Sequence, residues 1–268
     1  YEGAWVTPYK MHPQDHNIIV SGYKVVYRTT NATASNASAT WDSISPQFGE
    51  LKTIALAPSD LNYIYAATYS GIWVTKDDGQ SWDYIGSGLP SNISDITVSN
   101  TNPDRVFVTM SSFNDGEKVY ESTNAGATWI NISGTQLPNL PVNCIVYQNY
   151  SKDDLYIGTD IGVFHKDSTM TEWEFYNQDL PFVSVRELEI QYSVGKIRAA
   201  TFGRGVWESD LNSFPSSVSQ VNPEFIRVFP NPINSEFYVK TPYVLDNYKL
   251  KLFSITGKLL LEQSLKSD

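Results

Sequence analysis

Apolar and polar residues alternate with a period of two along many short stretches of the chain. The run 63–68, Tyr-Ile-Tyr-Ala-Ala-Thr, would place alternate residues on opposite faces of an extended strand. Such runs are rich in Val, Ile, Tyr, Phe and Thr, and clusters of Asn, Asp, Gly, Pro and Ser separate them. No stretch among them shows the 3.6-residue apolar stripe of an amphipathic helix. The pattern predicts an all-β fold.

The strand pattern recurs five times along the chain. Equivalent aromatic residues are spaced by 46, 47, 44 and 43 residues: Tyr27, Trp73, Tyr120, Phe164 and Trp207. A period of this length with several short strands per unit is typical of β-propeller blades. We therefore expect a partial propeller of about five four-stranded blades. In the second repeat the expected strands are 53–56, 63–68, 72–76 and 81–85.

The fifth repeat stops after its third expected strand, so five blades do not obviously close a ring. We expect Tyr1 to lie inside a larger propeller, with the missing blades preceding it.

Two loops between a third and a fourth expected strand share the pattern Ser/Thr-x-Asp-x-Gly-x-Ser/Thr-Trp. An Asp or Asn side chain can bond its own backbone two residues on, and Gly supplies the positive φ that such a turn needs. The pattern resembles the Asp-box, or bacterial neuraminidase repeat, whose role is structural. The matching residues are Thr75, Asp77, Gly79, Ser81 and Trp82 in the second repeat, and Ser122, Asn124, Gly126, Thr128 and Trp129 in the third.

The other repeats carry decayed versions of this loop. The fourth keeps Asp167 and Trp173 without the glycine, and the first has a longer loop that ends at Trp41. The segment 203–211 is similar to the closing strand of sortilin-type and xyloglucanase-type propellers. Those families range from glycoside hydrolases to protein-binding receptors, so the resemblance does not fix an activity. We assign residues 1–211 to the propeller.

The rest of the chain differs in composition. Residues 212–222 are rich in Ser and nearly uncharged, which is typical of a linker. Val-Phe-Pro-Asn-Pro follows at 228–232, then expected strands at 236–240, 248–253 and 259–263 around a turn at 254–258. These features resemble the type A C-terminal sorting domain of the type IX secretion system of Bacteroidetes.

That resemblance implies a small β-sandwich-like domain at 223–268, cut short at Asp268. It also implies export across the outer membrane by the secretion machinery, followed by release or attachment to the cell surface. A generic small β-sandwich is the alternative interpretation.

Charge and composition narrow the classes of partner. The formal net charge is −10, and non-specific nucleic-acid binding needs a cationic surface, so we expect no nucleic-acid partner. No run approaches 18 consecutive apolar residues, so we expect no transmembrane helix. The single cysteine, Cys144, lies in an apolar run and is expected to be a small buried residue.

No set of residues predicts catalysis. Sialidases share the Asp-box, but their Arg-Ile-Pro motif is absent here. Glycoside hydrolysis generally needs two carboxylates that face each other across a cleft. The adjacent pairs Asp77/Asp78 and Asp153/Asp154 are expected to be solvated turn residues instead. We therefore assign no catalytic residue to this chain.

Metal binding is also weakly signalled. His12 and His16 are four residues apart, but Pro13 between them indicates a turn rather than a helix. We expect an exposed loop there, and neither a metal nor a cofactor.

Ligands of propellers bind where loops converge near the central channel. Aromatic and polar side chains on the loops that join second to third strands could hold a sugar or a peptide. The same side chains could instead plug the channel or pack blade against blade. The candidates are Tyr23, Tyr69, Phe113, Asp160 and Arg204.

The sequence thus predicts a secreted or cell-surface propeller that binds a glycan or a cell-surface protein, or serves as a scaffold, without catalytic residues of its own. One alternative is the C-terminal part of a xyloglucanase-like glycoside hydrolase whose catalytic carboxylates lie upstream. A third is a receptor-like or purely structural module.

Overall fold

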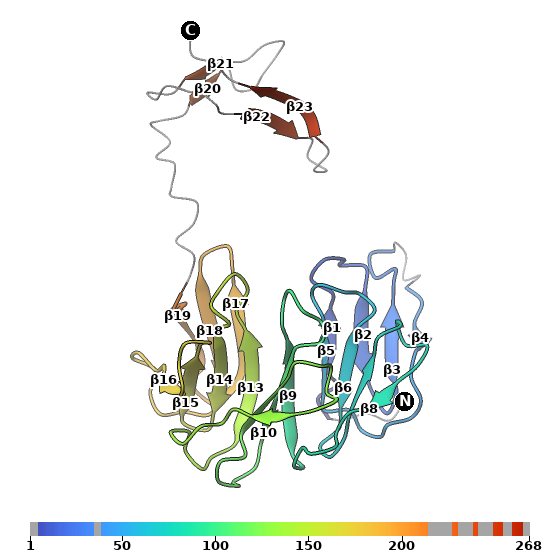
Figure 1. Cartoon of the computed structure of the whole chain (residues 1–268), viewed down its shortest axis with the longest axis vertical. Coiled ribbons are helices and arrows are strands. Elements are labelled where there is room, and N and C mark those ends of the chain that lie inside the picture. The colour runs from blue at the N-terminus through green and yellow to red at the C-terminus, as the bar shows by residue number, and fades with distance from the viewer. Residues whose placement is uncertain are drawn as a thin grey trace. The chain divides into compact units, whose positions relative to one another are not determined.

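The computed structural model describes residues 5–34, 39–213, 227–229, 238–240, 249–253 and 259–264. The chain divides into two units, Tyr1–Phe214 and Pro215–Asp268. Five antiparallel sheets form the first unit, and in each of them neighbouring strands follow one another along the chain (Figure 1). Four sheets have four strands and the fifth has three, so the predicted all-β blade architecture is confirmed.

We number these sheets as blades one to five. Blade one contains β1 (Tyr9–Met11), β2 (Ile19–Gly22), β3 (Val26–Thr29) and β4 (Asp42–Ser43). Blade two contains β5 (Thr53–Leu56), β6 (Ile64–Ala67), β7 (Ile72–Thr75) and β8 (Asp83–Tyr84). Blade three contains β9 (Ile93–Val98), β10 (Val106–Met110), β11 (Val119–Ser122) and β12 (Ile130–Asn131).

Blade four contains β13 (Val142–Tyr147), β14 (Leu155–Thr159), β15 (Gly162–Lys166) and β16 (Glu174–Phe175). Blade five contains β17 (Val185–Gln191), β18 (Lys196–Thr201) and β19 (Gly205–Asp210).

The first strand of each blade packs against the first strand of the next. This holds for β1 and β5, β5 and β9, β9 and β13, and β13 and β17. In Figure 1 these inner strands lie in the middle of the unit, with β15 and β16 farther out on one side and β3 and β4 farther out on the other. Because every blade is a meander in the same sense, loops of the same kind all emerge on the same face.

The hydrophobic core lies between blades rather than inside any one of them. Four buried clusters fill the four junctions from blade one to blade five. The middle strands therefore have apolar neighbours on both faces. All five residues of β10, Val-Phe-Val-Thr-Met, are buried, which explains why that run is almost wholly apolar.

The turns at 75–82 and 122–129 carry a tryptophan that reaches the preceding blade. Trp82 Nε1 donates to the Ile44 carbonyl at 2.7 Å, and Trp129 Nε1 donates to the Ile85 carbonyl at 2.7 Å. Trp173 makes the same bond to the Ile132 carbonyl at 2.9 Å, although its turn lacks the glycine. Each acceptor directly follows the fourth strand of the earlier blade. We call this indole-to-carbonyl bond the tryptophan staple.

Internal hydrogen bonds shape the turns themselves. In the 75–82 turn, Asp77 Oδ1 accepts from Thr75 Oγ1 and from the Ser81 backbone N–H, each at 2.8 Å. Gly79 has φ of +89°, and a Cβ there would come within 2.7 Å of Ile44 Cβ. In the 122–129 turn, Asn124 Oδ1 accepts from the Thr128 N–H at 2.9 Å. The turn therefore lies flat against the previous blade and aims the tryptophan at it.

Replacing Trp129 by phenylalanine tests the staple. Trp129→Phe keeps most of the apolar contact but leaves the Ile85 carbonyl without its donor, so we expect the free energy of unfolding to fall by about 1–2 kcal/mol. Equilibrium denaturation in urea measures this. The matched control is Trp207→Phe, because the Trp207 indole bonds only to Arg204 in its own loop. Equal losses in the two variants would contradict the staple.

The second unit is described only in its strands. β20 (Arg227–Phe229) pairs with β21 (Tyr238–Lys240), and β22 (Lys249–Phe253) pairs with β23 (Leu259–Ser264), both antiparallel. The predicted turn at 254–258 and most of the Val-Phe-Pro-Asn-Pro motif lie outside the described residues.

Candidate functional site

One face of the propeller unit carries large exposed aromatic rings. Loops that join second to third strands, and loops that join one blade to the next, emerge on this face. We call it the aromatic face and the opposite one, with the tryptophan turns, the turn face. The exposed fractions of its aromatic side chains are 53% for Tyr69, 67% for Phe113, 79% for Phe182 and 73% for Phe202. These rings stand on loops from blade two to blade five, so this face offers apolar surface along four successive blades.

Two of these rings have a cation beside them. Lys52 Nζ lies 5.6 Å from the Tyr69 ring centroid, and Arg186 Cζ lies 5.6 Å from that of Phe202. Each pair combines a flat apolar surface with a hydrogen-bond donor. That combination suits the C–H faces and hydroxyl groups of a sugar, or a peptide.

The five ligand-face candidates that the sequence predicts, Phe113 among them, all lie on loops of the aromatic face, but in different roles. Tyr69 and Arg204 are exposed. Tyr23 is half-buried and stands edge-on to Tyr27, with ring centroids 5.7 Å apart. Asp160 Oδ1 accepts from Asn143 Nδ2 at 3.0 Å and from Ser184 Oγ at 2.8 Å, which fixes the loops at the junction of blades four and five. The sequence reasoning missed Phe182, Phe202 and Lys52.

A separate cavity of about 260 Å³ lies along the axis. All five inner strands line it, and Pro13, Pro58, Asn100 and Tyr192 at its rim follow those strands toward the turn face. Its charged groups are Lys10, Asp95, Glu187 and Glu189. Lys10 Nζ lies 3.9 Å from Glu187 Oε1, and both side chains are largely exposed, so this ion pair adds little stability.

Asp95 ties three inner strands together beside this cavity. Its Oδ1 accepts from Thr53 Oγ1 in β5 at 2.8 Å, and its Oδ2 accepts from the Ile145 N–H in β13 at 3.1 Å. Withdrawal from solvent raises the pKa of Asp95, although Lys10 and both hydrogen bonds act in the opposite direction. Because both carboxylate oxygens already have protein donors, we interpret Asp95 as a structural residue.

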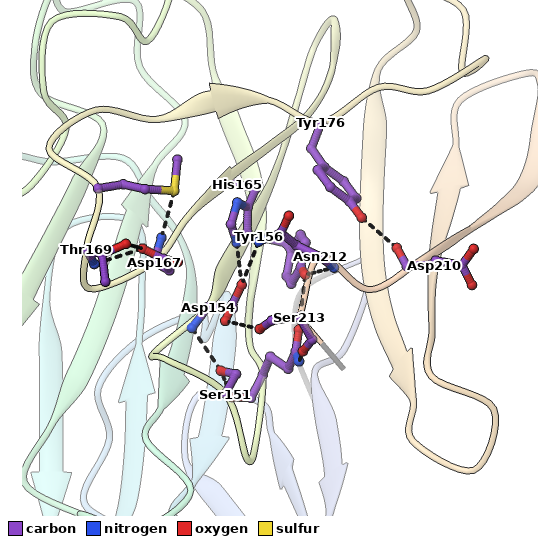
Figure 2. A network of polar contacts seen from close by, with 12 residues as sticks. Ser151, Asp154, Tyr156, His165, Asp167, Thr169, Tyr176, Asp210, Asn212 and Ser213 are labelled. Atoms are coloured by element: carbon purple, nitrogen blue, oxygen red, sulfur yellow. Dashed lines mark hydrogen bonds and ion pairs between the residues drawn. The ribbon is translucent and has the colours of Figure 1, made fainter. Parts of the chain in front are cut away.

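A second polar cluster surrounds Asp154 at the junction of blades four and five (Figure 2). Asp154 is fully buried, and its Oδ1 lies 2.5 Å from His165 Nε2. Its Oδ2 accepts from Ser213 Oγ at 2.7 Å, and Asn212 Nδ2 lies 3.4 Å from Oδ1. We call the three partners and Asp154 the Asp154 latch, because it holds residues 212–213 against blade four.

Neighbouring residues complete the hold on the end of the propeller. The Asn212 N–H donates to Tyr156 Oη at 2.8 Å, and Tyr176 Oη donates to the Asp210 carbonyl at 2.7 Å (Figure 2). Tyr176 directly follows the fourth strand of blade four. At the equivalent position, blades one to three have the isoleucine whose carbonyl accepts a staple. Blade five has no fourth strand among its described residues, so the latch takes the place of the tryptophan at this last junction.

The latch is not a nucleophilic triad. Ser213 Oγ donates to the carboxylate and not to His165, so the imidazole is not placed to take the serine proton. Burial alone would raise the pKa of Asp154, but hydrogen bonds from His165, Ser213 and Asn212 outweigh it and lower the pKa to about 2.

Two predictions about turn residues are wrong, one for Asp154 and one for His12. Asp154 is buried instead of solvated, whereas its neighbour Asp153 stays partly exposed and accepts a charge-assisted bond from Arg105 Nη1 at 2.9 Å. His12, which belongs to the β1–β2 loop, is also buried rather than exposed, and its Nε2 lies 3.3 Å from the Ala57 carbonyl of blade two. The sequence identifies these residues as turn residues, but it does not show which turns a neighbouring part of the fold buries.

Other expectations concern single side chains. Cys144 is buried as predicted, and burial raises its pKa well above the ordinary value, so it is not a reactive thiolate. Within the described ranges, no three His, Cys, Asp or Glu side chains gather as metal ligands. The same ranges contain no helix long and apolar enough to cross a membrane.

Residues 227–268 match the family described as secretion system C-terminal sorting domain. This tail identifies the chain as a secreted or cell-surface protein. No curated protein matches the sequence.

Solved structures with a similar fold are distant in sequence. The GH74 enzyme of Niastella koreensis shares 15% identity over 75% of this chain and 33% of its own, with a TM-score of 0.57. An ancestral GH74 enzyme shares 14% identity over 99% of this chain and 39% of its own length, with a TM-score of 0.62. The Cps50 (Swd1) β-propeller domain of Myceliophteria thermophila shares 12% identity over 100% of this chain and 89% of its own length, with a TM-score of 0.61.

YCF48 bound to D1 peptide shares 13% identity over 78% of this chain and 71% of its own, with a TM-score of 0.53. At these identities the likeness shows the propeller fold alone. The chain spans about one third of the length of the Niastella koreensis GH74 enzyme.

Proposed function

We propose that this protein is an exported propeller that binds a glycan at the cell surface through its aromatic face. The observation that carries the proposal is the set of exposed rings on successive blades, from Tyr69 to Phe202. Aromatic rings bind sugars by stacking on their C–H faces, and adjacent lysine or arginine can donate to hydroxyl groups. The sorting tail supports a location where such polymers occur.

A neutral glycan suits this face better than an acidic one. The chain carries a net charge of −10, and on the aromatic face Lys52, Arg186 and Arg204 are offset by Glu50, Asp115 and Asp179. A surface with no excess of cations does not attract polyanions. We also assign the 75–82 and 122–129 turns to the Asp-box family, on the hydrogen bonds of Asp77 and Asn124.

A second candidate function is the C-terminal part of a glycoside hydrolase of the xyloglucanase type. The likeness to two GH74 enzymes, of which this chain spans only a part, favours it. Its catalytic carboxylates would then lie outside this chain. A protein ligand on the same face is a third possibility, since YCF48 is a propeller solved with a peptide bound.

Affinity electrophoresis in gels that contain xyloglucan or mixed-linkage β-glucan tests the proposal. We expect Tyr69→Ala and Phe202→Ala each to weaken binding, measured as retardation, by about fivefold, because each removes a stacking ring worth about 1 kcal/mol. The matched control is Tyr150→Ala, an 80% exposed tyrosine on the turn face.

The outcomes separate the candidates. Loss of retardation in the two aromatic-face variants alone supports glycan binding. Equal loss in Tyr150→Ala contradicts the choice of face. Release of reducing sugar by the protein isolated from its producing cells favours the hydrolase, and absence of both binding and release favours a protein ligand.

A further inference from the structure

The tryptophan staple recurs at three junctions and lacks its acceptor at one further position. Trp41 follows Thr40 just as Trp129 follows Thr128, and it directly precedes the fourth strand of its blade. Trp82, Trp129 and Trp173 each donate to the blade before their own. Blade one is the first described blade, and no carbonyl in the described part of the chain accepts from the Trp41 indole.

On the side of Trp41, blade one exposes surface that the other blades bury against the blade before them. Its side chain is 46% exposed, whereas that of Trp173 at a complete junction is 2% exposed. A hollow of about 260 Å³ beside it is lined by Ser21, Tyr23, Tyr27 and Trp41. Tyr9 and Met11 of β1 are exposed as well. At the other junctions the equivalent inner-strand surface is buried against the neighbouring blade.

We propose that a further four-stranded blade of the same polypeptide packs on this side of blade one and completes the Trp41 staple. The residue after its fourth strand would present a backbone carbonyl to Trp41 Nε1. At the three complete junctions that residue is an isoleucine. The same contact between successive blades recurs at three junctions along the chain. A blade, and not a small ligand, is therefore expected to cover Trp41.

The described residues of a second copy of this chain offer no free acceptor of this kind. The carbonyls of Ile44, Ile85 and Ile132 already accept a staple within their own copy. The equivalent position in blade four, Tyr176, lies against blade five. Blade five has no fourth strand in its described residues, so head-to-tail association through it would leave Trp41 without a partner.

The Lys10–Glu187 contact does not close the ring in place of a further blade. At 3.9 Å and with both side chains largely exposed, it joins two side chains across the cavity and not two strands. Among the described strands, β1 and β17 do not pack against each other as the inner strands of successive blades do.

Hydroxyl-radical footprinting read by mass spectrometry tests the proposal on two samples. One is the protein isolated from its producing cells, and the other is the 268-residue chain expressed alone. We expect Trp41 in the isolated protein to be oxidised at least fivefold more slowly than in the chain expressed alone, and at a rate close to those of Trp82 and Trp129. Tyr150, exposed on the turn face, should be oxidised equally fast in both samples. Equally fast oxidation of Trp41 in both would overturn the proposal.

A photo-cross-linking residue placed at position 41 identifies what covers it. The proposal expects a cross-linked peptide from the same polypeptide and from outside residues 1–268. A peptide from a different polypeptide, or from a second copy of this chain, would overturn it. Trp41→Phe provides a further readout: it should lower the unfolding temperature of the isolated protein and leave that of the 268-residue chain unchanged. The reverse pattern would also overturn the proposal.

Discussion

Replacing Asp154 by alanine is expected to lower the free energy of unfolding of the propeller unit by about 3–5 kcal/mol. The variant leaves His165, Ser213 and Asn212 without their shared acceptor in a site that is closed to solvent. Buried polar groups that lose a charged partner pay the full cost of desolvation. Urea denaturation followed by tryptophan fluorescence measures the loss.

The neighbouring turn offers a matched control. Asp167 is a partly exposed carboxylate that bonds only to Thr169 nearby, so Asp167→Ala should cost less than about 1 kcal/mol. Similar losses for Asp154→Ala and Asp167→Ala would mean that the latch contributes no more than a surface turn.

The same carboxylate gives the propeller a defined acid sensitivity. Its folded pKa is about 2 and its ordinary value is 3.8, so the unfolded chain binds a proton at pH values where the folded latch does not. The contribution of Asp154 is therefore complete above about pH 4 and is lost as the pH falls toward 2, by roughly 2 kcal/mol. Asp154→Asn should remove this part of the slope of stability against pH. An unchanged slope would show that Asp154 titrates normally in the folded protein.

Truncation at two positions should give opposite results. Ending the chain after Phe214 removes the second unit and is expected to leave the unfolding of the propeller unchanged, because the two units are compact by themselves. Ending it after Asp210 also removes the buried Leu211 and both latch residues that bond Asp154. We expect that chain to lose about 4–6 kcal/mol, from one buried leucine and the hydrogen bonds to a buried charge.

Thermal unfolding of the two truncated chains beside the full chain is the measurement. Equal loss of stability in the chain that ends after Phe214 and the chain that ends after Asp210 would contradict the prediction. Success would mean that the sorting tail can be removed from a folded propeller at any point beyond the latch.

The strand architecture could be predicted because it depends on short-range pattern and on repetition. The period near 45 residues and the alternation inside each run locate every blade, and the strands of blade two lie where the sequence predicts them. The turn residues could also be predicted, since Asp77 and Ser81 bond within a few residues of each other.

Contacts between blades could not be predicted from the same signals. Each staple joins residues 38 to 44 positions apart, and only the repeated spacing of tryptophan and isoleucine hinted at it. Asp154 was misread for a related reason. Its neighbour Asp153 makes the pair resemble a solvated turn, whereas burial of Asp154 depends on residues 212–213 crossing over it. The exposure of Phe182 and Phe202 also depends on the three-dimensional arrangement of the loops, which the sequence pattern does not give.

The direction of the tryptophan staples has a consequence for the order in which the molecule assembles. In every staple the donor belongs to the later blade and the acceptor to the earlier one. A blade that emerges during synthesis or transport therefore finds its docking partner already present and needs nothing that is still to come. The closing step is then the Asp154 latch, because its partners Asn212 and Ser213 are the last residues of the propeller to emerge.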